Sequence, residues 1–368
     1  MYGRSFPIFF VTAWLSSAAF GDATSAPANT SATQCAPQSS TGVSLFLDEH
    51  LIVSPYGDRD YTGGGQLVFS GEKAARHWFT PDAPLGAIDH LLLSPDKSDS
   101  ELCAPSYAIG GGLLVFTPQD IQLAFVLPFD RPYASLIYLS NGRRYVRADD
   151  TVAFNTSLTI GALGLQAADT VQRALHSLTN SHKPLGWSHQ ISAGGEPTAR
   201  YTLSRQERLT EGSLGDWSRY DFKWTLGASA GTVTEGSLAL AGRWGRISSP
   251  WWSATPEQTT YAEDTHPAPP PLTADANSEL YVLFGGRVKP RGYNAFLEGQ
   301  FRHSDLRIHY NDLNQILAEA WTGAQWRSTH GWEIRFLSHW QTPEIRRSYS
   351  SYGSRKILWG SVEFGGSW

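Results

Sequence analysis

The chain has 368 residues, and its 29 Lys and Arg against 34 Asp and Glu give a net charge of -5 at neutral pH. Charged residues make up only 17%, below the roughly 25% of typical soluble domains, whereas 35 Gly and 14 Trp are abundant. No basic run exists to neutralise phosphates, which excludes nucleic acid as a partner, and an aromatic content of 12% excludes a disordered chain.

Residues 1–21 are typical of a secretory signal peptide. Arg4 supplies the positive start, Phe6–Phe20 is largely apolar, and the small residues Ala19 and Gly21 form a cleavage site. The alternative, a membrane anchor, needs about 20 apolar residues, and this stretch is shorter. No later segment approaches that length, so we expect export without a helical membrane span.

Residues 22–42 are rich in Ala, Ser, Thr and Pro and predict a flexible periplasmic lead-in. The two cysteines of the chain are Cys35 and Cys103. Cysteines of exported proteins can pair, but two cysteines leave the question open, and their spacing matches no zinc motif.

From residue 43 onward the chain alternates between apolar and polar residues. In 221–230, for example, Phe222, Trp224 and Leu226 alternate with polar or small residues, which predicts a strand with one apolar face. A soluble sandwich and a membrane barrel both give this pattern. Export, aromatic residues near strand ends and a last strand that ends on Trp368 favour an outer-membrane barrel over residues 43–368.

The alternation predicts an all-β, twelve-stranded antiparallel transmembrane β-barrel. Its strands are expected at about 42–49, 61–70, 108–116, 133–142, 152–163, 198–208, 219–231, 235–246, 278–289, 311–324, 329–341 and 356–368. An even number of strands puts both ends in the periplasm. Connections then face outward at 50–60, 117–132, 164–197, 232–234, 290–310 and 342–355, and face the periplasm at 71–107 and 247–277.

One outward connection predicts a short helix over about 170–180, capped by Asp169 or Thr170. Val171, Leu175 and Leu178 follow the i, i+4, i+7 spacing, so one helix face is apolar. We expect this helix to cover the barrel wall or to touch lipid.

Acidic residues mark the first outward connection. Asp48 and Glu49 end the first strand and His50 follows them, so their oxygens could bind a hard cation. The alternative is a solvated rim loop. Thr62, at the start of the next strand, is by itself an ordinary strand residue. Asp130 and its neighbour Arg131 are expected to fix the second outward loop.

Histidines mark the third outward connection. His176 on the predicted helix can act as a general base, which requires a neutral imidazole; the alternative is a solvated or packing residue, and the same holds for His182 and His189. The sequence has no Gly-x-Ser-x-Gly, P-loop, dinucleotide fingerprint or His-Glu-x-x-His motif. A covalent serine mechanism therefore has no support.

Several short motifs occur in a fixed order along the chain. They are Asp58-Arg59-Asp60-Tyr61-Thr62-Gly63-Gly64; Phe116-Thr117-Pro118; Asp130-Arg131-Pro132-Tyr133-Ala134; His176 followed by Pro184, Gly186-Trp187 and Gln190; and Tyr293-Asn294-Ala295-Phe296-Leu297 with Gly299. Each motif is weak, but the ordered set resembles the lipid A 3'-O-deacylases of the outer membrane.

The resemblance implies a monomeric barrel with its site at the outer-leaflet end, which hydrolyses the ester-linked 3' acyl chain of lipid A with Ca2+. It assigns His176 as the base that activates water, Thr62 and His182 as further catalytic residues, and Asp48 and Glu49 as metal ligands. The Ca2+ ion would polarise the ester carbonyl and stabilise the oxyanion.

The sequence departs from the family at three places. The family has Glu-Asn-Asp where this chain has Asp48-Glu49-His50. The Asn-Asp pair of the family can be aligned either with Asp48-Glu49 or with Glu49-His50. A family Glu six residues after the catalytic histidine is His182 here, and a family Gly is Ser135. The departures at Asp48-Glu49-His50 and His182 keep open a catalytically inactive structural or binding barrel. A second alternative is an outer-membrane phospholipase that uses the same base on glycerophospholipids.

Overall fold

The computed structural model describes residues 35, 40–50, 59–75, 80–94, 101–215, 217–259, 261–263, 265–272 and 278–368. The signal peptide predicted at 1–21 lies outside the described residues, as does most of the lead-in predicted at 22–42. Among the described residues, no helix has both the length and the apolar character that a membrane crossing requires.

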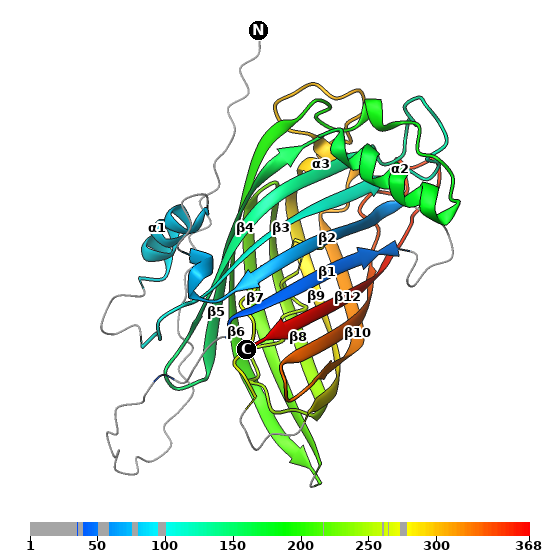
Figure 1. The fold of residues 1–368 in the computed structure, drawn as a ribbon. Helices are drawn as coiled ribbons and strands as arrows, with labels where there is room; N and C mark the ends of the chain where they lie inside the picture. The colour runs from blue at the N-terminus through cyan, green and yellow to red at the C-terminus, as the bar shows by residue number, and fades with distance from the viewer. Residues whose placement is uncertain are drawn as a thin grey trace, which may run out of the picture. The chain divides into compact units, whose positions relative to one another are not determined.

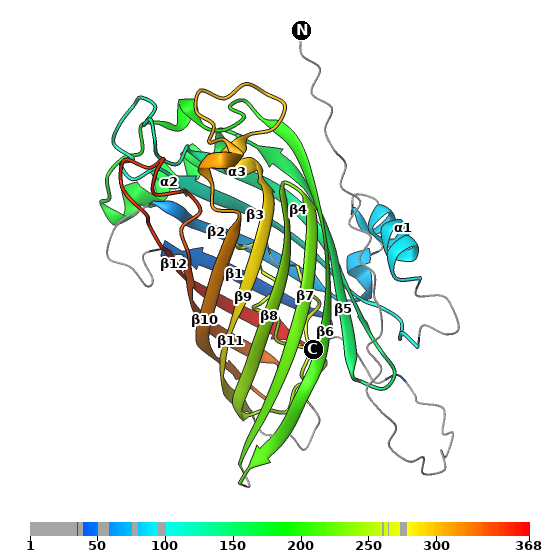
Figure 2. The same cartoon turned by 180° about the vertical axis from the view of Figure 1, so that it is seen from behind.

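The strands form a closed antiparallel barrel in which each strand pairs with its sequence neighbours and β12 pairs with β1 (Figures 1 and 2). The strands are β1 (Gly42–Glu49), β2 (Asp60–Ser70), β3 (Ser106–Thr117), β4 (Ala134–Val146), β5 (Val152–Leu163), β6 (Glu196–Leu214), β7 (Ser218–Gly231), β8 (Val233–Arg246), β9 (Glu279–Asn294), β10 (Ile316–Arg327), β11 (Trp332–Gln341) and β12 (Ile357–Ser367). The predicted twelve-stranded all-β barrel is confirmed.

Within the described residues of the connections, the structure has three α-helices and three short 3-10 helices. They are α1 (Asp82–Leu92), α2 (Ala167–Thr179), α3 (Ala295–Glu298), η2 (Glu72–Ala75), η4 (Trp187–His189) and η5 (Tyr310–Asp312). Helix α2 is the helix predicted at 170–180, but it begins earlier and has no side-chain cap. The predicted cap residue Asp169 instead lies within the first turn, where it pairs with Arg173 four residues on.

The barrel is apolar outside and polar inside. Side chains alternate between the two faces of each strand, so that Phe222 is exposed while Lys223 is buried in the lumen. Exposed apolar residues of the outer surface include Leu45, Leu47, Leu67, Phe69, Leu226, Leu238, Leu240, Phe284, Ile334, Phe336 and Phe364. This inverted pattern is that of a wall whose outer face contacts lipid.

The connection between β8 and β9 folds back into the lumen. It begins and ends at the periplasmic end, as strand parity predicts, but its described residues 247–259, 261–263 and 265–272, here called the plug, do not remain in the periplasm. Trp251 and Trp252 are 3% exposed, Glu257 1% and Ala262 0%. The sequence-based placement of 247–277 outside the barrel is therefore wrong for this part of the connection.

Cationic side chains of the wall hold the plug. Arg287 donates to the Glu257 carbonyl at 2.6 Å, and Arg144 donates to the Pro267 carbonyl at 3.0 Å. Lys223 lies 2.9 Å from the Glu257 carboxylate. Buried cations need acceptors, and the plug supplies them from its backbone as well as from its side chains.

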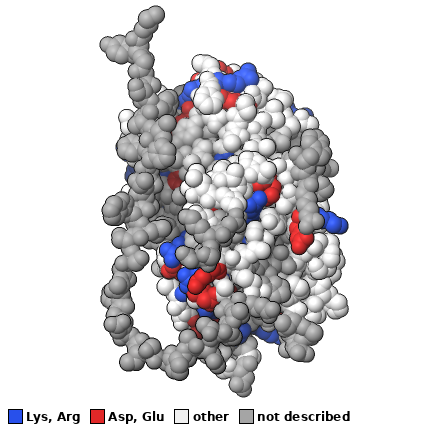
Figure 3. Space-filling view, turned by 90° about the vertical axis from the view of Figure 1, so that its left-hand side faces the viewer, with Lys and Arg blue, Asp and Glu red and all other residues white. Residues whose placement is uncertain are grey.

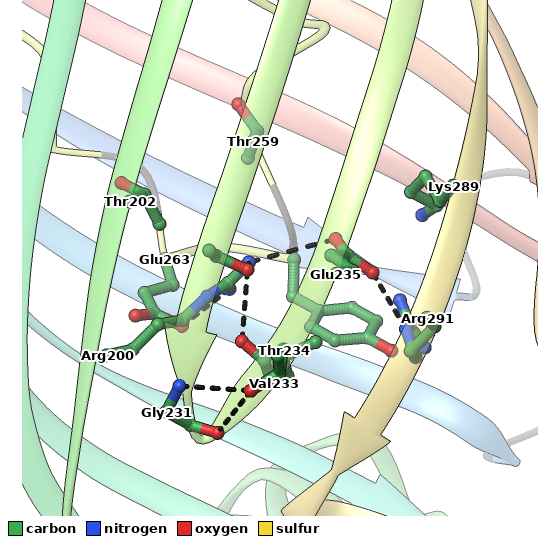
Figure 4. Close-up of polar contacts among 12 residues, drawn as sticks. Arg200, Thr202, Gly231, Val233, Thr234, Glu235, Thr259, Glu263, Lys289 and Arg291 are labelled. Atoms are coloured by element: carbon green, nitrogen blue, oxygen red, sulfur yellow. Dashed lines mark hydrogen bonds and ion pairs between the residues drawn. The ribbon is translucent and has the colours of Figure 1, made fainter. Parts of the chain in front are cut away.

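The same arrangement continues toward the outer end of the barrel. Arg200 of β6 lies between Glu263 of the plug and Glu235 of β8, at 3.5 Å and 3.7 Å, and Glu235 also accepts from Arg291 of β9 at 2.7 Å (Figure 4). Two cavities beside the plug measure ≈ 50 Å³ each, enough for a few water molecules. The lumen is therefore packed rather than open.

The plug predicts that the folded protein does not conduct ions. In planar bilayers we expect no steady current steps from the full chain, whereas a variant with residues 250–272 replaced by a short Gly-Ser turn should conduct. Heat-modifiable migration on gels is the control that the variant still forms a barrel. Steady conductance of the unaltered protein would contradict the packed lumen.

A disulfide joins Cys35 to Cys103, which resolves the pairing that the sequence left open. The backbone N–H of Cys103 donates to the carbonyl of Val146, the last residue of β4, at 2.9 Å. The bridge thus ties the segment before β1 to the periplasmic end of the wall.

Candidate active site

A β-bulge places Thr62 at the outer end of β2. The register pairs Tyr61 with Phe116 and Gly63 with Val115, so Thr62 is an extra residue without a partner on β3. Its hydroxyl lies 2.6 Å from the hydroxyl of Thr117. Bulges turn individual side chains and are common beside active sites, so the backbone gives Thr62 a setting that an ordinary strand residue lacks.

The lumen side of the bulge is filled by Tyr61. Its hydroxyl donates to the carboxylate of Asp48 at 2.7 Å and accepts from the backbone N–H of Ala262 in the plug at 2.9 Å. Its ring lies 4.6 Å from the ring of Tyr261, also in the plug. The plug therefore supports the strand ends that carry Thr62 from behind.

The predicted metal ligands Asp48 and Glu49 lie on opposite faces of β1. Asp48 points into the lumen toward Tyr61, so strand alternation directs Glu49 outward. Glu49 pairs with Gly63 beside the bulge, and a Cβ on Gly63 would lie 2.6 Å from the Asp48 carbonyl, so the close approach of β1 and β2 requires glycine there. His50, directly after β1, is 2% exposed.

This arrangement does not fit a calcium site built from both carboxylates, because the oxygen ligands of Ca2+ must converge on one ion, whereas Asp48 and Glu49 project from opposite faces of β1. Among the described residues, no group of three or more His, Cys, Asp or Glu side chains is placed to hold a metal ion. Calcium binding stays a prediction for the chelation experiment below.

Helix α2 presents a polar inner face and an apolar outer face. Ala168, Gln172 and His176 follow one another at four-residue spacing and are buried, with His176 8% exposed. Val171, Leu175 and Leu178 on the other face are 43%, 53% and 84% exposed. The expectation that this helix covers the wall is confirmed, and its apolar face is exposed; contact of that face with lipid stays a prediction.

The chain reverses after α2 and returns to His176. Asn180 ends the helix in the left-handed conformation, with φ of 56°. The Nδ1 atom of His176 then forms a hydrogen bond to the carbonyl oxygen of His182. Because a carbonyl only accepts, neutral His176 carries its proton on Nδ1, and Nε2 bears the basic lone pair.

Trp187 fixes Gln172, which lies one turn before His176 on the same face of the helix. Its indole N–H donates to the side-chain oxygen of Gln172 at 2.8 Å, and its ring lies 4.8 Å from Tyr133. Burial raises the pKa of Tyr133, which keeps its hydroxyl protonated as the donor to the Ile121 carbonyl at 3.0 Å. The helix is thus held to its own connection and to the preceding one.

Helix α2 lies on the wall that carries Thr62. Ala168 of α2 packs in one buried cluster with Val115 of β3 and with Trp187, and Val115 is the partner of Gly63 across the bulge. Phe116 points into the lumen, so Val115 and Thr117 point outward. Figure 1 shows α2 across the outer ends of β2 and β3. His176 and Thr62 therefore share the outer face at one end of the barrel.

Arg355, from the β11–β12 connection, joins the surrounding loops. It lies 2.9 Å from the carboxylate of Asp60 and 2.5 Å from that of Asp130. Asp130 also accepts from the backbone N–H of Arg131 at 2.7 Å, while the Arg131 guanidinium lies 2.8 Å from Glu344. Asp130 and Arg131 fix their loop, as expected, but through different partners.

The structure brings only some of the predicted site residues together. Thr62 and Glu49 lie on the outer face of the wall, His176 lies on α2, which packs against that face, and Asp48 points into the lumen. The side chain of His182 is exposed, and its backbone carbonyl is what holds His176. His189 lies apart, 2.5 Å from Asp305. The prediction missed Gln172, although its position four residues before His176 places both on one helix face.

The comparisons with known proteins agree with this architecture. The family described as outer membrane protein LpxR matches residues 10–364 of the sequence. The chain belongs to this family. Its membership confirms the relationship predicted from the ordered motifs, and it places the protein in the outer membrane.

Solved structures add the fold. The structure of LpxR from Salmonella typhimurium is similar with a TM-score of 0.66 and 13% identity, over 89% of this chain and 100% of that chain. The beta domain of the Bordetella autotransporter BrkA aligns with a TM-score of 0.39 and 9% identity, over 90% of this chain and 100% of that chain. No curated protein sequence matches.

Proposed function

We propose that this protein is a monomeric lipid A 3'-O-deacylase, which hydrolyses the ester-linked 3' acyl group of lipid A in the outer leaflet. The observation that carries the proposal is His176: a buried imidazole, oriented by a backbone carbonyl, on a helix between the barrel wall and the membrane. Family membership supports the same reaction class.

The chemistry needs one base and one donor. Nε2 of His176 takes a proton from water, and the water oxygen attacks the ester carbonyl carbon. The bond from that carbon to the sugar oxygen then breaks, and the proton returns to the sugar oxygen. The products are a fatty acid and a sugar hydroxyl.

The negative charge that develops on the ester oxygen needs a hydrogen-bond donor. Thr62 and Thr117 share one hydrogen bond between their hydroxyls. Because one of the two donates to the other, the pair retains a second proton for an acceptor. We assign this donor role to the Thr62–Thr117 pair.

The apolar side of α2 suits a membrane-bound substrate. Val171, Leu175 and Leu178 leave an exposed apolar surface next to the exposed apolar residues of the wall. An acyl chain that remains in the leaflet can lie along this surface while its ester approaches His176. A water-soluble ester would have no need of it.

Mass spectrometry of lipid A from a host that expresses the protein tests the proposal, with and without a divalent-metal chelator. We expect the loss of one 3'-linked acyl group. Unchanged lipid A with altered phospholipids would support a phospholipase, and no change in either would support an inactive barrel. Activity that is lost with the chelator and restored by Ca2+ would confirm the metal prediction.

His182 provides a second test. The structure uses its backbone carbonyl to orient His176, whereas the resemblance gives its side chain a catalytic role. His182→Ala keeps the carbonyl, so we expect the deacylation rate to stay within a few-fold of the unaltered protein. His182→Pro, which changes the backbone at this residue, should lower the rate more. Complete loss of activity in His182→Ala would restore the side chain to the mechanism.

A further inference from the structure

Helix α1 covers a charged patch on the outside of the barrel wall. Arg144 of β4 points inward to the Pro267 carbonyl, so its neighbour Arg143 points outward. There its Nε and Nη2 atoms donate to the two carboxylate oxygens of Asp82 in α1, at 2.8 Å and 2.7 Å. Figures 1 and 2 show α1 outside the wall.

The next turns of α1 extend this polar contact. Asp89, 0% exposed, accepts from Tyr145 of β4 at 2.9 Å, Thr156 of β5 at 2.9 Å and Tyr201 of β6 at 3.2 Å. Its carboxylate thus joins three strands. The inner face of α1 is therefore matched to the polar groups of the wall by specific hydrogen bonds.

Gly86 sets how closely the helix approaches. A Cβ at this position would lie 2.6 Å from the Nη2 atom of Arg143. The guanidinium therefore lies against the bare backbone of the helix. Glycine is unfavourable inside a helix, and here it allows the Arg143 guanidinium to approach this closely without a shift.

The exposed face of α1 is apolar instead of charged. Leu91 is 81% exposed and Leu92 53%. The other exposed residues of the helix are Ala83, Pro84, Ala87 and His90, so no acidic residue, Lys or Arg belongs to this face. A surface helix of a water-soluble protein shows the opposite order, with its apolar stripe toward the core.

The wall beside α1 is lipid-facing. Thr156, which contacts α1, is followed on the same face of β5 by Leu158 and Ile160, and Ile160 is 42% exposed. Figure 3 shows this side of the molecule, where residues without charge predominate among the described atoms. The part of the wall that continues from the Thr156 contact toward the outer end of the barrel is thus apolar.

We propose that α1 lies in the membrane as an additional layer on the barrel, with its polar face bound to Arg143, Tyr145, Thr156 and Tyr201 and its apolar face against lipid acyl chains. The helix then shields a charged side chain on the lipid side of the wall, which would otherwise be unfavourable in hydrocarbon. This inference depends on the barrel and not on the proposed reaction.

Site-directed spin labelling in phospholipid vesicles tests the proposal. The chain has two cysteines, which form a disulfide, so a nitroxide attached to Leu91→Cys reports on one site. Leu226→Cys on the lipid-facing surface and Asp149→Cys in a periplasmic turn are the matched controls. Collisions with apolar oxygen should exceed those with a water-soluble nickel complex at 91, as at 226, and the order should reverse at 149.

Two results would overturn the proposal. A label at 91 that behaves like the one at 149 would place the exposed face in water. A label shielded from both quenchers would show that protein, such as a second copy of the chain, covers the face. Leu92→Cys repeats the measurement on the next residue, and heat-modifiable migration checks that each labelled barrel is folded.

Discussion

Replacing His176 with alanine is expected to lower the deacylation rate by about 10²–10⁴-fold, the usual contribution of a general base. The imidazole is buried, and its Nδ1 atom is held by the His182 carbonyl. Alanine removes the base, and because His176 lies on α2 the substitution changes no strand of the barrel. The measurement is the initial rate of fatty acid release from purified lipid A in detergent micelles.

The matched control is His189→Ala in the same connection. His189 is partly exposed and lies 2.5 Å from Asp305, so its loss should leave the rate nearly unchanged. Both variants should keep heat-modifiable migration, because neither residue belongs to a strand. An unchanged rate in His176→Ala would remove this residue from the mechanism.

The strands were predictable because successive side chains face lipid and lumen in turn. Lipid outside and a polar lumen inside require the polarity to change at every residue. This alternation can be recognised in the sequence without knowing which strands pair. Phe222 and Lys223 show it within a single step. Strand ends were harder to predict: β6, expected to end at 208, continues to Leu214.

The plug and α1 were not predictable in this way, because both depend on distant partners. The plug carbonyl of Pro267 is bound by Arg144, which is 123 positions away in the sequence. Helix α1 buries Asp89 and exposes Leu91, so its pattern contradicts the rule by which a water-soluble helix is recognised. The partners of each segment are residues of distant strands, so its position depends on the folded barrel.

The site was predicted in part. Helical spacing predicted where His176 lies, and the motif order drew attention to Thr62. The bulge that singles out Thr62 is a register shift between two strands, which no local pattern encodes. The faces of Asp48 and Glu49 follow from strand alternation once Tyr61 is known to point inward, but the sequence could not supply that direction.

Replacing Glu344 with alanine is expected to destabilise the barrel by about 3–5 kcal/mol, as breaking buried ion pairs does. Glu344, 4% exposed, lies 2.8 Å from Arg131, pairs with Arg291 and accepts from the Tyr261 hydroxyl at 2.8 Å. Its loss leaves two guanidinium groups buried without this carboxylate. Chemical unfolding in detergent, followed by Trp fluorescence, measures the change.

Glu211→Ala is the control, because Glu211 also forms an ion pair, at 3.1 Å with Arg208, but its side chain is 45% exposed. Exposed pairs contribute about 0–1 kcal/mol, so this variant should differ little from the unaltered protein. Similar losses in both variants would show that burial does not determine the effect, and would contradict a structural role for the Glu344 cluster.

The pH dependence separates charge from packing at Glu344. Burial alone would raise the pKa of Glu344, but Arg131 and Arg291 outweigh it and lower the pKa from 4.5 to about 2. The charge therefore stabilises the fold above pH 4.5, and this contribution is lost as the pH falls toward 2. Glu344→Gln keeps the volume and an acceptor for Tyr261 but cannot titrate. The difference in unfolding free energy between the unaltered protein and Glu344→Gln should therefore shrink across that window. A constant difference would mean that packing, and not the buried charge, holds these outer connections together.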